Sequence, residues 1–252
     1  MNGVALCSRF SLPTADRRFC GPATAPGSLR DALRGKAARA RQDLRRFEAL
    51  FPYLEVIAEE TGKDPLDEEV IEAYWIGNSL LERDWRPGFL EILRRLEKRG
   101  LPRTIGERLA QSLPPRPLPY HTFHVLFVGV GAVTGHVPTT LRNMRECCIG
   151  WGRVARLGER IEVDTMGLCR TPAGVGVTGP RSCVLNRGEG LGDVAVGDVV
   201  ASHWGEAVLR LTETQVRSVA RFTATAVASA NEAAACAAPP SLYRVAPISS
   251  ST

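Results

Sequence analysis

A thiol and an imidazole bracket one stretch of this chain. Cys147 stands near its start, next to Cys148, and His203 stands near its end. Between them lie short β-prone runs broken by glycine and proline, a pattern typical of a small barrel of short strands. Cysteine and histidine are the side chains that bind borderline and soft transition metals. The stretch from 147 to 212 therefore predicts a metal site carried by a barrel.

Two ligands do not saturate a transition metal. A structural zinc site normally supplies four ligands and closes the shell, whereas a two-ligand site leaves positions open for other ligands or for a partner. This openness suits a carrier that holds a metal and then releases it. We predict Cys147 and His203 as the metal ligands, and we take Cys148, His121 and His124 as secondary candidates.

The two ends of the stretch resemble the HypC/HupF chaperones of NiFe-hydrogenase maturation, over residues 147–231. The family opens with a cysteine followed by Gly-x-Val, and it closes with a Val-Gly-Asp-x-Val-x-x-His-x-Gly-x-Ala run. The matching residues are Cys147, Gly152 and Val154 in the first motif, and Val196, Gly197, Asp198, Val200, His203, Gly205 and Ala207 in the second. The N-terminal part is similar to an uncharacterised hydrogenase-associated family.

The resemblance implies an OB-like barrel that holds iron carrying cyanide and carbon monoxide. It also implies two partners: an iron–sulfur maturation protein of the HypD type and the precursor of the hydrogenase large subunit. Cys147 would be the thiolate ligand and His203 the imidazole, with the turn at Gly197 and Asp198 placing His203. This chain departs from the family pattern because Cys147 is internal, Trp151 replaces the usual proline, and the loop between the motifs is longer.

Composition bounds the remaining possibilities. The chain has 252 residues, of which 44% are hydrophobic and 23% charged, so a packed core is feasible. There is no secretory signal and no apolar run long enough to span a bilayer, so we expect a cytoplasmic protein without membrane contact. The net charge of +5 is modest and the aromatic content is 6%, and both argue against nucleic-acid binding as a function.

Seven cysteines in a reducing compartment indicate free thiols or metal ligands rather than disulfides. Cys7, Cys20 and Cys236 are isolated in the sequence, and we interpret each as a small buried apolar residue. Cys169 and Cys183 lie in a glycine-rich insertion, and no CxxC spacing supports a second metal site there.

The predicted fold class is α+β, with an N-terminal helical domain followed by a small OB-like β-barrel and a C-terminal helix. Apolar stripes at helical spacing fill the first part, and a capping box at Thr212–Gln215 starts the last helix. The predicted divisions are a helical domain (1–113), a proline-rich linker and junction (114–146), the barrel with its helix (147–235) and a disordered tail (236–252).

Two segments outside the barrel bear on the site. Residues 1–28 contain several prolines and glycines and are predicted to be irregular. Residues 120–128 are predicted to form a strand, on which His121 and His124 would point to opposite faces and could share a metal only if the segment bends or is helical. The glycine-rich loop 129–138 lacks the Gly-Lys-Ser/Thr ending of a phosphate loop.

Two other function classes stay open at this stage. Cys147 or Cys148 with His203 could form the nucleophile and base of a thiol-dependent enzyme, although no third member is recognisable. An OB-like barrel could also bind nucleic acid.

Overall fold

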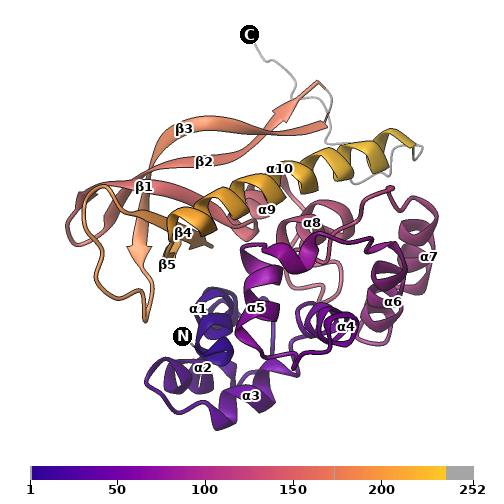
Figure 1. The fold of residues 1–252 in the computed structure, drawn as a ribbon, viewed down its shortest axis with the longest axis horizontal. Coiled ribbons are helices and arrows are strands. Elements are labelled where there is room, and N and C mark those ends of the chain that lie inside the picture. The colour runs from indigo at the N-terminus through magenta and orange to yellow at the C-terminus, as the bar shows by residue number, and fades with distance from the viewer. Residues whose placement is uncertain (1, 173, 237–252) are drawn as a thin grey trace.

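The computed structural model describes residues 2–172 and 174–236 of the chain, in a mixed α+β fold (Figure 1). The prediction of N-terminal helices, a sheet and a C-terminal helix is confirmed. The predicted tail lies outside the described residues beyond Cys236. The helices are α1 (Gly3–Asp16), α2 (Ala25–Leu33), α3 (Ala38–Leu44), α4 (Phe51–Thr61), α5 (Glu68–Trp75), η1 (Ser79–Leu81), α6 (Arg86–Glu97), α7 (Arg103–Gln111), α8 (His121–Phe123), η2 (His124–Gly129), α9 (Leu141–Cys147) and α10 (Glu213–Cys236).

Side-chain caps fix where several helices begin. Asp67 accepts a hydrogen bond from the Glu69 amide at the start of α5, and Thr140 accepts one from the Asn143 amide at the start of α9. At α10 the expected capping box is present, since Thr212 and Gln215 each bond the other's backbone amide. The cap at Thr140 starts the helix that ends at Cys147, and the predicted capping box starts the helix that follows the barrel.

The prediction of irregular structure over residues 1–28 is wrong for residues 3–16 and 25–28, which are helical. Residues 3–16 form α1, capped by Asn2, and the helix continues through Pro13. Almost every residue of α1 is buried, so the helix is stabilised by packing rather than by an amphipathic pattern. The proline, which we read as a breaker, is accommodated two residues after Ser11 in the last turns of the helix.

The prediction of a strand over residues 120–128 is also wrong. The segment is helical, with α8 continuing directly into the π-helical turn η2. It is buried on nearly every side, so it lacks the polar face that would have marked a helix in the sequence. In the helix, His121 and His124 lie three residues apart on one face, with ring centroids 6.5 Å apart.

The strands form a closed barrel in the order β1-β2-β3-β5-β4. All neighbouring pairs are antiparallel except β3 with β5, and the pairing of β1 with β4 closes the ring. The long β2–β3 hairpin matches the insertion expected between the two motifs. The strands are β1 (Gly150–Leu157), β2 (Ile161–Thr171), β3 (Gly174–Arg187), β4 (Val199–His203) and β5 (Glu206–Arg210).

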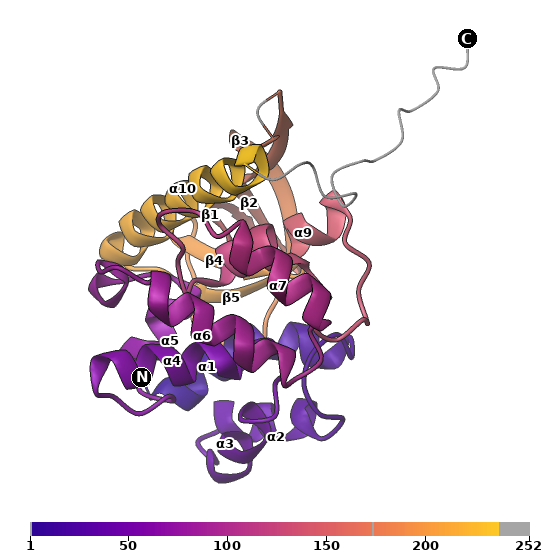
Figure 2. The ribbon, with the colours of Figure 1, turned by 90° about the vertical axis from the view of Figure 1, so that its right-hand side faces the viewer.

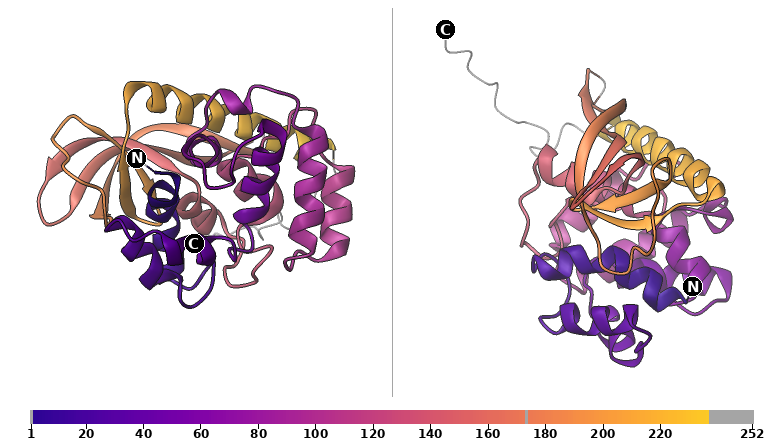
Figure 3. Two further views of the ribbon diagram at one scale, coloured as in Figure 1. Left: turned by 60° about the horizontal axis from the view of Figure 1, so that its bottom comes forward. Right: turned by 90° about the vertical axis from the view of Figure 1, so that its left-hand side faces the viewer.

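Helices cover the barrel on two sides. The α10 helix runs beside the β2–β3 hairpin, where Asn231 bonds the backbone of Val175 in both directions (Figures 1 and 2). The α1 helix packs against β5 (Figure 3). One buried hydrophobic cluster contains residues of α1, the helical segment 120–130 and α10, while a smaller cluster fills the barrel interior. The division into separate domains at 114–146 stays a prediction.

No helix within residues 2–172 and 174–236 is long and apolar enough to cross a membrane.

Candidate metal centre

Three buried side chains from separate parts of the fold bring metal donors together. The ligand atoms of His121, Cys147 and His203 all lie within 4.8 Å of one another. His121 comes from α8, Cys147 ends α9 and His203 ends β4. The two residues predicted as ligands are therefore neighbours, and one of the secondary candidates joins them.

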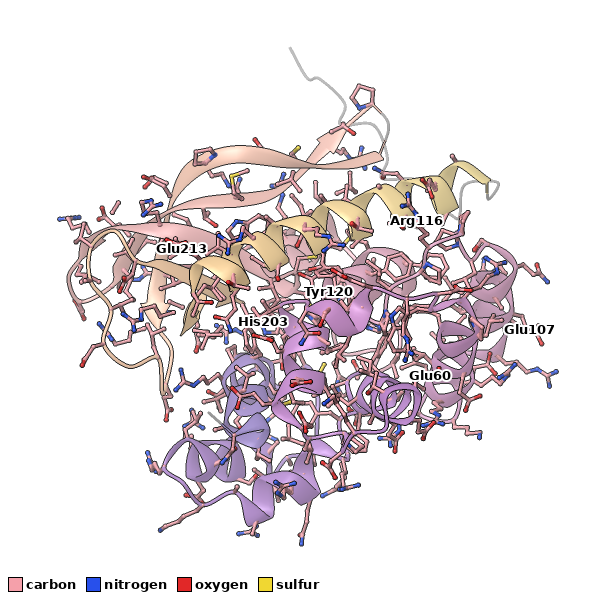
Figure 4. All side chains as sticks on the ribbon, viewed as in Figure 1. Glu60, Glu107, Arg116, Tyr120, His203 and Glu213 are labelled. Carbon is pink, nitrogen blue, oxygen red and sulfur yellow. The ribbon has the colours of Figure 1, made fainter. Side chains whose placement is uncertain are left out.

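Strand pairing explains why the two sequence motifs meet. Gly150 at the start of β1 pairs with Ser202 near the end of β4, which sets Cys147 beside His203. The amide of Trp204 donates to the carbonyl oxygen of Glu146 at 2.8 Å. This bond also joins the chain next to His203 to the chain next to Cys147. Figure 4 labels His203 where the strands meet the N-terminal helices.

The turn after His203 is held from both sides. Trp204 and Gly205 have positive φ values of 50° and 76°, as in the tight hairpin turns that join antiparallel strands. Arg17 at the end of α1 donates to the Trp204 carbonyl oxygen at 2.9 Å and pairs with Glu206. The position of His203 is thus fixed by the barrel and by the first helix together.

His203 presents a free nitrogen to the site. Its Nδ1 lies 2.7 Å from the carbonyl oxygen of Phe10, and a carbonyl only accepts, so Nδ1 carries the proton. In the neutral ring Nε2 then has an available lone pair. Nε2 is buried and has no hydrogen-bond partner within the described residues. A ring oriented by a backbone carbonyl through one nitrogen is the usual arrangement of a metal-binding histidine.

His121 is oriented by two oxygens. Its Nε2 lies 2.8 Å from the Cys147 carbonyl oxygen, so this nitrogen donates, and Nδ1 accepts from the Tyr74 hydroxyl at 3.0 Å. The same Nε2 is 3.7 Å from the Cys147 sulfur. To bind a metal through Nε2, His121 must move its proton to Nδ1, where the Tyr74 hydroxyl can accept a hydrogen bond as readily as donate one.

Aromatic rings enclose the imidazoles. The Trp75 ring lies 4.4 Å from the ring of His121 and 5.4 Å from that of His203, and it stacks on Phe10 at 5.1 Å. The two imidazoles meet edge to face at 5.3 Å. This packing restricts the ring orientations, which favours a preformed site.

A small cavity of about 50 Å³ adjoins the three donors. This volume exceeds that of a single water site but is far below that of a pocket for an organic cofactor. No Asp, Glu, Lys or Arg is among the described residues that line it. Its apolar wall comes from the segment between α3 and α4 and from the glycine-rich loop: Phe47, Leu50, Val130, Val133 and Val137.

Burial sets the protonation states of the donors. Burial, followed by the neighbouring Cys20, raises the pKa of the Cys147 thiol well above its usual range. Burial lowers the pKa of His203 to about 4 and that of His121 well below its usual range. The donors are therefore a neutral thiol and neutral imidazoles at pH 7. A metal that binds here must displace the thiol proton.

The remaining secondary candidates lie outside this group of three. His124 lines the same cavity, but its Nδ1 is hydrogen-bonded to the Tyr53 hydroxyl at 2.9 Å. Cys148 is buried and lines a different cavity, together with Trp151 and Thr165. Adjacent thiols thus serve two cavities, as expected when the chain leaves the helix in an extended conformation after Cys147.

A family model matches residues 1–237, which is nearly the whole chain. The chain belongs to the family described as a family of unknown function, DUF6390. No curated protein and no solved structure matches it significantly. The family membership covers the helices and the barrel alike, so both halves of the site belong to it.

Sequence reasoning missed the groups that orient the donors. Tyr74 has no sequence feature that points to the site, and Phe10 lies in a segment predicted to be irregular. The sequence did contain one signal for His121, its three-residue spacing from His124. That spacing places two side chains on one face of a helix but on opposite faces of a strand.

Proposed function

We propose that this protein is an accessory protein of NiFe-hydrogenase maturation that holds an iron fragment through Cys147 and His203, with His121 as a third ligand. The convergence of these three buried donors at one uncharged cavity carries the proposal. A thiolate and imidazoles are suitable ligands for low-spin iron. With its proton on Nδ1, His203 has an Nε2 lone pair that is available to a metal.

The HypC-like part of the proposal draws on the architecture of the barrel. Its strand order, its parallel β3–β5 pair and the helix α10 that follows support an OB-like assignment. The proposed partners are an iron–sulfur protein of the HypD type and the precursor of the large subunit. The helices of residues 1–113 supply the Phe10 carbonyl oxygen that bonds His203 and the Tyr74 hydroxyl that bonds His121. They are therefore part of the site.

Charge balance favours an iron that carries its own anionic ligands. Divalent iron bound to one thiolate and two neutral imidazoles leaves an uncompensated positive charge, and a buried unpaired charge is costly. The cavity lining described here offers no carboxylate to offset it. Cyanide ligands on the iron would do so, and the small cavity suits diatomic ligands.

A thiol-dependent enzyme is the weaker alternative. A nucleophilic cysteine requires a thiolate at neutral pH, whereas burial raises the pKa of both Cys147 and Cys148. An OB-like nucleic-acid module gains no support from a site buried between helices and barrel.

The test is anaerobic purification of the tagged full-length protein from a host with active hydrogenase maturation. Metal analysis and infrared spectroscopy are applied to wild type, Cys147→Ser and Cys148→Ser. We expect iron with cyanide and carbonyl bands in wild type and in Cys148→Ser, and neither in Cys147→Ser. Iron without these bands would restrict the proposal to simple metal binding. Iron retained in Cys147→Ser would contradict the assigned ligand.

A further inference from the structure

A second thiol, Cys20, lines the same cavity as the three donors. It is partly buried and packs against the main hydrophobic cluster, as the sequence interpretation expects in part, whereas Cys147 and the two histidines are fully buried. After burial, Cys20 is the group that most raises the pKa of Cys147, in keeping with their place on one cavity. It does not belong to the group of donors that lie within 4.8 Å of one another.

The turn that carries Cys20 is fixed on three sides. The Phe19 ring packs on Trp204 at 4.7 Å, and the Phe19 carbonyl oxygen accepts from the Thr134 hydroxyl at 3.2 Å. Gly21 has a φ of +82°, and a side chain there would meet the Phe47 ring at 2.5 Å. Cys20 is therefore held between the turn after His203 and the glycine-rich loop, at the partly exposed part of the cavity lining.

A metal ion needs a ligand on its way to or from this site. Most of the cavity wall is apolar and uncharged, and moving an unliganded cation along it would carry a large desolvation cost. Outside the three donors, the lining residues with a soft or borderline donor are His124 and Cys20. His124 is buried and bonded to Tyr53, whereas Cys20 is only partly buried, although burial raises the pKa of its thiol to about 12. The unpartnered Nε2 of His203, on a side chain that is 1% exposed, marks the inner end of the path.

We propose that Cys20 is a transient ligand through which the metal passes between the buried site and the outside of the protein. This inference rests on the proposed metal-binding function and adds the route of transfer to it. Cys147, His203 and His121 hold the metal, and Cys20 exchanges with them one ligand at a time as the metal enters or leaves. A transient ligand lowers the barrier in both directions and leaves the equilibrium affinity unchanged.

The test measures Co²⁺ exchange in the anaerobic full-length protein. Stopped-flow absorbance at the thiolate-to-cobalt band gives the loading rate, and an excess of EDTA gives the removal rate. We expect Cys20→Ser and Cys20→Ala to slow loading and removal by the same factor, about tenfold or more, at an unchanged Kd. Cys183→Ser, at a thiol of β3 outside this cavity, is the matched control and should leave both rates at the wild-type values.

The remaining outcomes separate the two proposals. Unchanged rates in both Cys20 variants, with Co²⁺ bound by wild type and lost in Cys147→Ser, would overturn the role of Cys20 alone. A lower affinity and a weaker absorbance band in Cys20→Ser would also overturn it, because Cys20 would then be a resident ligand. Absence of Co²⁺ binding by wild type would overturn both proposals. Melting temperatures of all variants verify that the fold is retained.

Discussion

At the scale of single residues, the hydrogen bonds at Nδ1 of His203 and His121 decide which ring nitrogens can bind a metal. Phe10 fixes the proton of His203 on Nδ1 and leaves Nε2 free, while Tyr74 bonds the Nδ1 of His121. Removing the hydrogen-bond partner of a metal-binding histidine typically weakens metal affinity by about 10–100-fold. Tyr53 makes the same kind of bond to His124, which is outside the group of three donors.

This pair of tyrosines gives a matched prediction. Tyr74→Phe should weaken metal binding by about 10–100-fold, because the Nδ1 proton of a metal-bound His121 loses its acceptor. Tyr53→Phe should leave the metal Kd near the wild-type value. Both substitutions remove one buried hydrogen bond and should cost about 1–3 kcal/mol of stability. Metal titration and thermal unfolding of each variant measure the two effects. Equal losses of affinity would show that Tyr74 acts only through stability.

Cys147 and His203 were predictable because their types and flanking motifs indicate metal chemistry without any structure. Tyr74, Phe10 and Cys20 were not, since each acts through a neighbour that is distant in sequence. A backbone acceptor in particular has no residue type that could reveal it. The sequence thus indicates the donors, and the packing determines which of their atoms are available.

At the scale of elements, the barrel was predicted more faithfully than the helices that complete the site. Short β-prone runs broken by glycine and proline predicted a barrel of short strands between 147 and 212, and β1 to β5 lie within that stretch. The helical segment at 121–129 was misread because its β-branched and aromatic residues are buried all round, and periodicity cannot separate that case from a buried strand. The same absence of a polar face, together with Pro13, hid α1.

The glycine-rich loop, residues 129–138, covers the cavity and offers a test of its packing. Gly131 and Gly135 have similar φ values of 73° and 71°, but a Cβ on Gly131 would lie 2.0 Å from the Val137 carbonyl oxygen, whereas nothing lies within 4 Å of one on Gly135. Gly135→Ala should cost only the left-handed strain, about 1–2 kcal/mol.

Gly131→Ala should cost at least about twice as much as Gly135→Ala, because the loop must move away from the clash. It should also speed metal release, since Val130 and Val133 would be displaced from the cavity wall. Chemical denaturation and EDTA removal rates of the two variants provide the comparison. Similar stabilities and similar release rates would mean that the loop does not seal the cavity.

At the scale of the whole molecule, the buried histidines link folding to pH. Burial lowers the pKa of His124 and His203 to about 4 and that of His121 well below its usual range. Unfolded histidines have a pKa of about 6.5, so below that pH the unfolded chain binds protons that the folded chain excludes. The histidines therefore destabilise the fold progressively as pH falls from about 6.5 to about 4, and they contribute no pH dependence above about 7.

Metal-free protein should accordingly lose about 1.4 kcal/mol of stability per pH unit for each of these histidines across that window. Urea unfolding between pH 7 and pH 4.5 measures the slope. His124→Gln should reduce this slope by about 1.4 kcal/mol per pH unit. The control is His136→Gln, at an exposed position, which should leave the slope unchanged. A slope that is unaffected by His124→Gln would contradict the assignment of a neutral, buried imidazole.

The continuous core joins the helical part to the barrel through the site itself, since His121 and His203 belong to different parts and share the Trp75 ring. The ligand environment of a bound metal is therefore the most direct probe of the whole account. X-ray absorption spectroscopy of the zinc-loaded full-length protein should find one sulfur at about 2.3 Å and imidazole nitrogens at about 2.0 Å. The sulfur should disappear in Cys147→Ser and remain in Cys148→Ser. A shell of oxygen and nitrogen alone in wild type, or a sulfur that persists in Cys147→Ser, would contradict it.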